Sequence, residues 1–253
     1  MDAISRGAWF PTNEPIHFDV TGHLRNGQHR LTAIANSGHV LQQLVVRGAT
    51  EEEIDSIDTG TRRLPGDVLA LRHFVADGDT AATALKMLYS VEHGWLPVQG
   101  GRNHLKDKNK GMNNHEVGRY FTFHPEIVKS VEYINETPVL RKLLGSRGTM
   151  AFCHYSITQK CKSVNSNAGY DFFHALERDI YKDFDDPVYR LRERLTRAKS
   201  ATPQSKDKLS VTAAAALIIK AWNLWITGRS ITRLAWRTNG IIPEAFPTPL
   251  APK

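Results

Sequence analysis

The hydrophobic pattern of this chain of 253 residues changes near residue 65, and this change constrains the fold more than any other feature. Before it, short apolar stretches alternate with polar residues and end at glycines, which is typical of β-strands joined by turns. After it, apolar residues recur three and four positions apart, the spacing of one face of an α-helix. The pattern therefore predicts an α+β protein: a small mixed sheet with short helices in residues 1–65, and a mainly α-helical part in residues 66–253.

The first part is expected to contain three strands and two short helices. The predicted elements are, in chain order, strand 16–20, a strand that begins at Leu24, helix 28–36, strand 40–46 and helix 50–56. Gly38 can end the first helix, and Thr50 and Glu53 have the spacing of a capping box. We expect a short sheet, or one that another chain completes, as a homodimer would.

Nine helices are predicted in the second part. They cover residues 65–76, 80–93, 114–121, 125–134, 138–144, 149–160, 170–180, 187–199 and 209–227. Asp186 before Pro187 is a favourable helix start, and Gly228 can end the last helix. The segment 96–114, rich in Gly, Asn and Lys, is expected to be a loop.

Composition and charge limit the class of protein. Lys and Arg number 33 against 26 Asp and Glu, and this net charge of +7 favours a polyanionic partner such as DNA. The most apolar stretch, 211–226, contains Lys220 and is shorter than the roughly 20 residues of a membrane-spanning helix. We expect no membrane partner and, since no export leader is recognisable, a cytoplasmic location. Cys153 and Cys161 are expected to be core thiols, and the scattered histidines predict no metal site.

Basic residues concentrate in two stretches, the predicted loop and the predicted helix 187–199. Each stretch alone is accounted for by a solvated surface. Together with the net charge, they make nucleic acid a reasonable partner. The helix residues expected to bind nucleic acid are Arg190, Arg194, Arg197 and Lys199.

The turn Asn26-Gly27-Gln28-His29-Arg30 is the best candidate for a binding site. A strand ends there and a helix begins at once, so unpaired backbone N–H groups and the positive end of the helix dipole meet at one point. Gly27 lets a phosphate approach the backbone, and His29 and Arg30 add side-chain donors. The alternative is an ordinary Asn-Gly turn before a solvated helix.

The same residues carry a resemblance to a known family. Asn-Gly-Gln-His-Arg-Leu-x-Ala at residues 26–33, preceded by Ile-x-Phe-Asp-x-x-Gly-x-Leu at residues 16–24, resembles the core motif of the ParB/sulfiredoxin-like superfamily. This form, often written DGQHR, is frequent in bacteriophage proteins, and Asn26 here replaces its Asp. The resemblance covers about the first 65 residues. It implies a nucleotide-phosphate site lined by Gly27, Gln28, His29 and Arg30, with His29 and Arg30 in catalytic roles, and the host cytoplasm as the location if a phage encodes the chain.

Branches of this superfamily include a CTP-dependent DNA clamp, an ATP-using sulfinic acid reductase, a serine kinase and nucleases, so the resemblance implies ATP or CTP with Mg²⁺ as the cofactor. Gln28 replaces the cysteine of the reductases, which leaves that reaction without its thiolate. A kinase or a nuclease needs a carboxylate, which Asp19, Asp55 or Asp58 could supply if folding brings it to Arg30.

A second cluster, residues 54–63, follows the predicted third strand. Its acidic, small and basic residues suit a loop over an anion pocket, with Asp58 orienting an arginine or a metal ion and Arg62 contacting phosphate. The alternative is a helix end with a surface salt bridge. Phage proteins of the resembling form tend to show a similar segment, so we predict a catalytic role for Asp58 and phosphate binding by Arg62.

Three functions follow from these observations. The first is a DNA-associated protein that binds a nucleotide or nucleic-acid phosphate at residues 26–30. Whether it also has nuclease or NTPase activity is left open. The second is a nucleotide-dependent phosphotransferase acting on a hydroxyl of a small molecule or a modified nucleotide. The third is a non-catalytic phage regulatory protein that binds a host partner. The sequence favours the first, because it uses both the turn and the basic helix.

Overall fold

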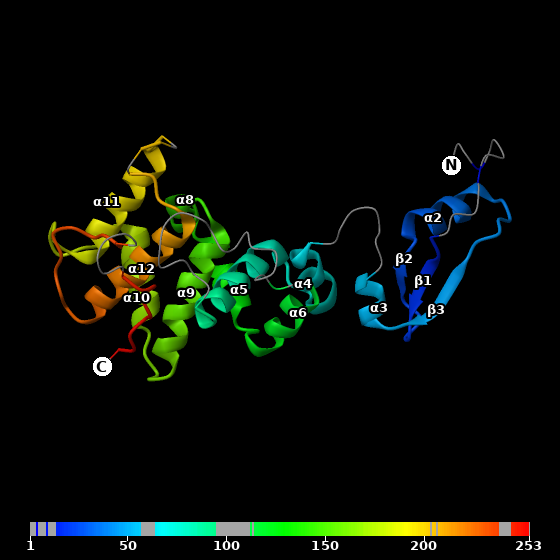
Figure 1. Cartoon of the computed structure of the whole chain (residues 1–253), viewed down its shortest axis with the longest axis horizontal. Helices are drawn as coiled ribbons and strands as arrows, with labels where there is room; N and C mark the ends of the chain where they lie inside the picture. The colour runs from blue at the N-terminus through cyan, green and yellow to red at the C-terminus, as the bar shows by residue number, and fades with distance from the viewer. Residues whose placement is uncertain are drawn as a thin grey trace. The chain divides into compact units, whose positions relative to one another are not determined.

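The chain divides into two compact units, Met1–Arg63 and Leu64–Lys253. The computed structural model describes residues 14–56, 64–94, 114–202, 207–237 and 244–252, together with residues 4, 9, 112, 204 and 205. Within these ranges the architecture is α+β: a three-stranded mixed sheet in the first unit and a mainly helical second unit (Figure 1).

The sheet of the first unit is built around β1 (Ile16–Asp19), with β2 (Leu24–Asn26) on one side and β3 (Val45–Ala49) on the other. β2 pairs antiparallel with β1 through a tight turn, and β3 pairs parallel with it after a helical crossover. Helices α2 (Gln28–Ser37) and α3 (Glu51–Ser56) both contact β1 (Figure 1).

The third strand differs from its predicted position. We expect it at residues 40–46, but β3 begins at Val45 and continues past Gly48. Its register explains the shift, because pairing with β1 joins Ile16 to Val45, whereas Val40 is fully exposed. A β-branched apolar stretch therefore indicated a strand nearby, but only the pairing partner decided which residues join it.

The ends of the short helices follow the predicted chemistry. Gly38 ends α2 with φ +65°. Thr50 and Glu53 form the predicted capping box: the Thr50 N–H donates to Glu53 Oε2 at 2.8 Å, and the Glu53 N–H donates to Thr50 Oγ1 at 3.3 Å.

The second unit contains every helix predicted for it, with ends shifted by a few residues. The described helices are α4 (Pro65–His73), α5 (Gly78–Glu92), α6 (Asn114–Phe123), α7 (Ile127–Glu136), α8 (Pro138–Leu144), α9 (Arg147–Lys162), α10 (Ala168–Arg178), α11 (Pro187–Ser200) and α12 (Val211–Ile226). Asp186 caps α11 by accepting a hydrogen bond from the Val188 N–H at 2.8 Å, and Gly228 follows α12 with φ +67°.

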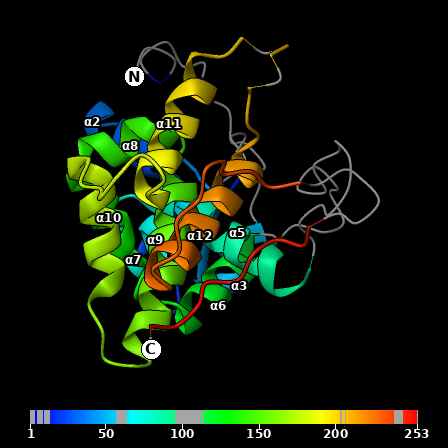
Figure 2. The same ribbon diagram turned by 90° about the vertical axis from the view of Figure 1, so that its left-hand side faces the viewer.

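The core of the second unit forms around α9, which contacts α5, α7, α8, α10 and α12 (Figure 2). Cys153 and Cys161 of α9 are buried free thiols, as predicted. His154 is also fully buried, with Nδ1 2.9 Å from Ser130 Oγ, and burial lowers its pKa to about 3. This histidine is therefore neutral at physiological pH and belongs to the core. Within the described ranges, no helix is both long and apolar enough to cross a membrane.

Candidate functional site

The turn before α2 has the backbone conformation that a close approach requires. Gly27 precedes the helix with φ +91°, in the left-handed region. A Cβ atom placed on it would lie 2.9 Å from Ile16 Cγ1 and 3.2 Å from Ile16 Cα. Glycine is therefore required here for two reasons: the backbone adopts a left-handed angle, and β1 passes directly against this position.

The first turn of α2 carries no side-chain cap. The first helical hydrogen bond runs from the Leu31 N–H to the Gly27 carbonyl at 2.8 Å, which leaves the earlier N–H groups of the turn outside the helical ladder. No acidic residue lies in this turn, and Gln28 and His29 are exposed. An anion at this helix end would meet backbone donors and the exposed His29 imidazole.

Two of the predicted site residues make local contacts that shape the turn. Asn26 accepts a hydrogen bond on Oδ1 from the Gly27 N–H at 2.7 Å. Arg30 is largely buried, and its guanidinium donates to the carbonyls of Glu14 and Pro15, with Nη2 also 3.7 Å from the Glu14 carboxylate. Arg30 thus ties α2 to the chain that enters β1, and a phosphate ligand would compete with Glu14 for it.

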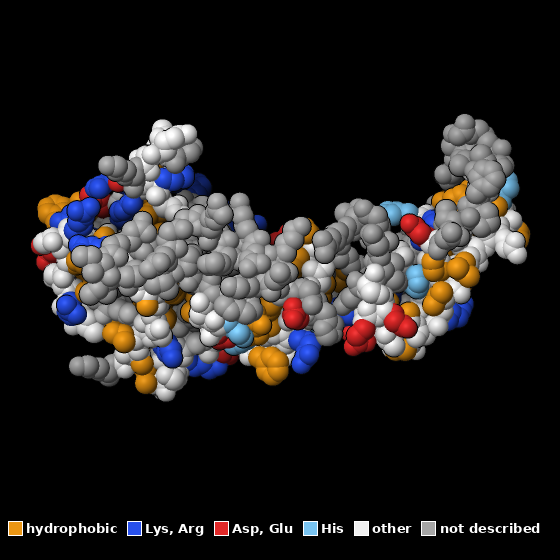
Figure 3. Space-filling view, in the orientation of Figure 1, with side chains coloured by type: hydrophobic (Ala, Val, Ile, Leu, Met, Phe, Trp, Pro, Cys, Tyr) orange, Lys and Arg blue, Asp and Glu red, His pale blue; other side chains and the backbone are white. Residues whose placement is uncertain are grey.

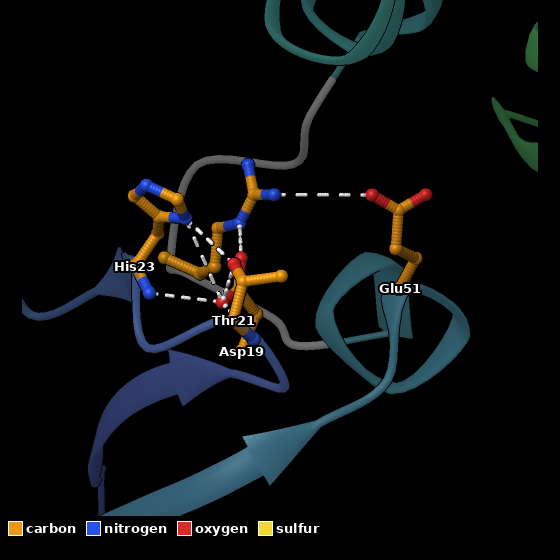
Figure 4. A network of polar contacts seen from close by, with 5 residues as sticks. Asp19, Thr21, His23 and Glu51 are labelled. Carbon is orange, nitrogen blue, oxygen red and sulfur yellow. Dashed lines mark hydrogen bonds and ion pairs between the residues drawn. The ribbon is translucent and has the colours of Figure 1, made fainter.

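A polar network around Asp19 holds the β1–β2 hairpin (Figure 4). Asp19 Oδ1 accepts from the N–H groups of Thr21 and His23, both at 2.9 Å, and from the Thr21 hydroxyl at 2.6 Å. Asp19 Oδ2 accepts from Arg25 Nε at 2.7 Å, and Arg25 Nη2 lies 3.8 Å from Glu51 of α3. The Thr21 hydroxyl, the backbone donors and Arg25 together hold the pKa of Asp19 well below its usual range.

This network also sets the tautomer of His23. The Thr21 hydroxyl has one hydrogen, and the ionised Asp19 takes it. The Thr21 oxygen, 2.6 Å from His23 Nδ1, must then accept from that ring nitrogen. Nδ1 of His23 therefore carries a proton, and this hydrogen bond ties the exposed imidazole to the hairpin.

The network positions the turn, because Arg25 immediately precedes Asn26 and Gly27. Sequence reasoning missed Thr21, His23 and Arg25 as a group. Their signal is the alternation of Asp19, Thr21, His23 and Arg25 at every second residue, which places polar side chains on one side of a tight hairpin. Asp19 itself, considered from sequence as a carboxylate for catalysis or metal binding, has both oxygens occupied by donors of its own hairpin.

No family model, curated protein or solved structure matches this chain. Among the described residues, no group of three or more His, Cys, Asp or Glu side chains is placed to hold a metal ion. Asp58, Arg62 and the side chain of Asp55 lie outside what the structure describes.

The basic helix predicted to bind nucleic acid is α11, and Figure 3 shows Lys and Arg side chains gathered at the end of the second unit where it lies. All three of its predicted arginines have acceptors. Glu193 lies between two of them, 3.3 Å from Arg190 and 2.6 Å from Arg197, and Arg190 also pairs with Asp185 at 3.0 Å. Arg194 donates to the Asp207 carbonyl at 2.8 Å, and Lys199 is exposed.

Proposed function

We propose that this chain is a DNA-associated protein whose first unit binds a nucleotide or nucleic-acid phosphate at the N-terminus of α2, as its resemblance to ParB/sulfiredoxin-like proteins implies. ATP or CTP with Mg²⁺ and DNA are the ligands of first choice. The basic side of α11 supplies further contacts to the nucleic acid.

The observation that carries this proposal is the geometry at Gly27. Its positive φ and its contact with Ile16 hold the strand end against the helix start, and the uncapped first turn presents N–H donors and contains no acidic residue of its own. A phosphate group fits such a helix end because both the donors and the helix dipole favour negative charge.

Arg30 has a positioning role in this proposal. Its guanidinium already donates to the carbonyls of Glu14 and Pro15, so it holds the helix start at a set distance from β1. A bound phosphate can share this guanidinium, because the Glu14 carboxylate beside it is exposed and makes only a 3.7 Å ion pair. Asp19 is occupied by its own hairpin, so it is not the carboxylate that a catalytic extension of this proposal would use.

The test is the variant His29→Glu in the full chain. A glutamate in the first turn favours the helix dipole by about 0.3–1 kcal/mol, so the fold is kept, but its charge repels a phosphate at the same N–H groups. Calorimetric titration with ATP and CTP, each with and without Mg²⁺, and with a short DNA duplex at low salt measures the dissociation constant. We expect it to rise at least about tenfold for the ligand that the turn binds.

Thr32→Glu is the matched control, because Thr32 is an exposed residue of the same helix beyond its first turn. It introduces the same charge and should change the dissociation constant about twofold or less. If none of the ligands binds the wild type, or if the two variants behave alike, the proposed site is wrong.

A further inference from the structure

A cavity of about 430 Å³ lies in the second unit, between α11, the start of α12 and the segment that follows α12. One part of its lining is cationic and another part is apolar and aromatic. The residues that matter for its chemistry are Arg190, Arg194, Arg197, Arg233, Leu217 and Trp236. Its volume lies near the lower end of the roughly 300–1,000 Å³ that small-molecule sites occupy.

The charge of the lining favours a dianion. Among the lining residues, four arginines stand against two acidic residues, Glu193 and Asp207, a net charge of +2, and Asp185 pairs with Arg190 from outside the lining. A phosphate monoester carries about −1.5 to −2 at pH 7, whereas a backbone phosphodiester carries −1. The cavity therefore matches a terminal phosphate better than one phosphate within a strand.

The arginines are held in place before any ligand arrives. Glu193 accepts from Arg190 at 3.3 Å and from Arg197 at 2.6 Å, and Arg194 reaches across to the Asp207 carbonyl. Nε of Arg190 is buried and has no hydrogen-bond partner among the described residues.

Arg233 and Trp236 complete the site from the segment after α12. The Arg233 side chain is exposed and makes no ion pair or hydrogen bond within the described part of the chain. The Trp236 indole N–H donates to the Ala245 carbonyl at 3.1 Å, and its ring packs edge-on against Phe246. A fixed aromatic ring beside a free guanidinium suits a ligand that joins a planar base to a phosphate.

We infer that this cavity is a second site, which binds a phosphate monoester joined to a nucleobase, as in a 5′-mononucleotide or the 5′-phosphorylated end of a strand. The inference rests on the proposed function for the choice of a nucleotide as ligand. Its geometry is independent of the turn at Gly27, so one set of variants can test the two sites separately.

The experiment is calorimetric titration of the full chain with adenosine 5′-monophosphate, adenosine and inorganic phosphate. Arg233→Glu removes the free guanidinium and cancels the net charge of the lining, and it breaks no described ion pair. Arg229→Glu is its control, because Arg229 is also exposed after α12 but does not line the cavity. His29→Glu reports on the turn of the first unit.

We expect adenosine 5′-monophosphate to bind the wild type and the variant Arg229→Glu alike, and to bind Arg233→Glu at least about tenfold more weakly. Adenosine and phosphate should each bind more weakly than the nucleotide. The inference fails if the nucleotide does not bind, if Arg233→Glu binds as the wild type does, or if only His29→Glu loses binding, which would assign the nucleotide to the turn.

A pair of oligonucleotides, with and without a 5′-phosphate, then distinguishes the two sources of the ligand. Preference for the phosphorylated strand, lost in Arg233→Glu, assigns the cavity to a strand end. Nucleotide binding that depends on Arg233 without that preference assigns it to the free mononucleotide.

Discussion

Replacement of Gly27 by alanine should destabilise the first unit strongly, and the structure gives two separate reasons. At φ +91° an L-residue pays about 1–2 kcal/mol for the left-handed conformation. The new Cβ also lies 2.9 Å from Ile16 Cγ1 and 3.2 Å from Ile16 Cα and Cβ, and forcing an extra methyl into such contacts costs about 1–3 kcal/mol. We expect the free energy of unfolding of the first unit to fall by about 2–5 kcal/mol in all.

Gly38→Ala is the matched variant, because Gly38 ends the same helix with φ +65° but has nothing within 4 Å of the position of a Cβ. Both variants lose the same flexibility in the unfolded chain, so that contribution cancels when their free energies of unfolding are compared. The remaining difference of about 1–3 kcal/mol isolates the contact with Ile16.

Hydrogen exchange followed by mass spectrometry suits this comparison, since it reads the amides of β1 without the unfolding of the second unit. Because each 1.4 kcal/mol is a factor of ten, β1 should exchange about 5- to 150-fold faster in Gly27→Ala than in Gly38→Ala. Equal protection of β1 in the two variants would refute the close approach of β1 to the turn, and with it the geometry on which the phosphate site depends.

Two further predictions concern charges of the first unit. Because folding lowers the pKa of Asp19, its carboxylate stabilises the fold above the usual pKa of 3.8, and this contribution is lost as the pH falls below that value. Asp19→Asn should therefore lower the hydrogen-exchange protection of the hairpin at pH 7 and make that protection depend less on pH between pH 5 and 3. An unchanged pH profile would contradict the network. Glu14→Gln removes the carboxylate beside Arg30, so it should tighten phosphate binding at the turn about two- to fivefold with little loss of stability. Weaker binding in a calorimetric titration would show that Glu14 instead holds Arg30 in place for the ligand.

The secondary structure of this chain could largely be predicted from local patterns. The helices of the second unit followed from apolar spacing and from starts such as Asp186, and the capping box of α3 followed from Thr50 and Glu53. These features depend on residues within one or two turns of each other. The third strand was misplaced because its register depends on Ile16, a partner distant in sequence.

The candidate site was only partly predictable. Residues 26–30 stood out as a strand end followed by a helix start, which is a local feature of the sequence. The contact between Gly27 and Ile16, and the backbone acceptors of Arg30, appear only when the strand passes beside the helix. Arg30 therefore looked like a free phosphate ligand, whereas the structure gives it a role in holding the turn.

The amino-acid sequence by itself determined the α+β character, the division into a short sheet and a helical part, the approximate position of each helix in the second part and the excess of positive charge. Each of these is set by neighbours along the chain or by composition. Only the tertiary structure decided that Arg194 meets the Asp207 carbonyl and that Arg233 lines the same cavity as α11. The physical reason is that charge and hydrogen-bond partners act over a few ångströms, and residues far apart in sequence reach that distance only through the packing of the helices.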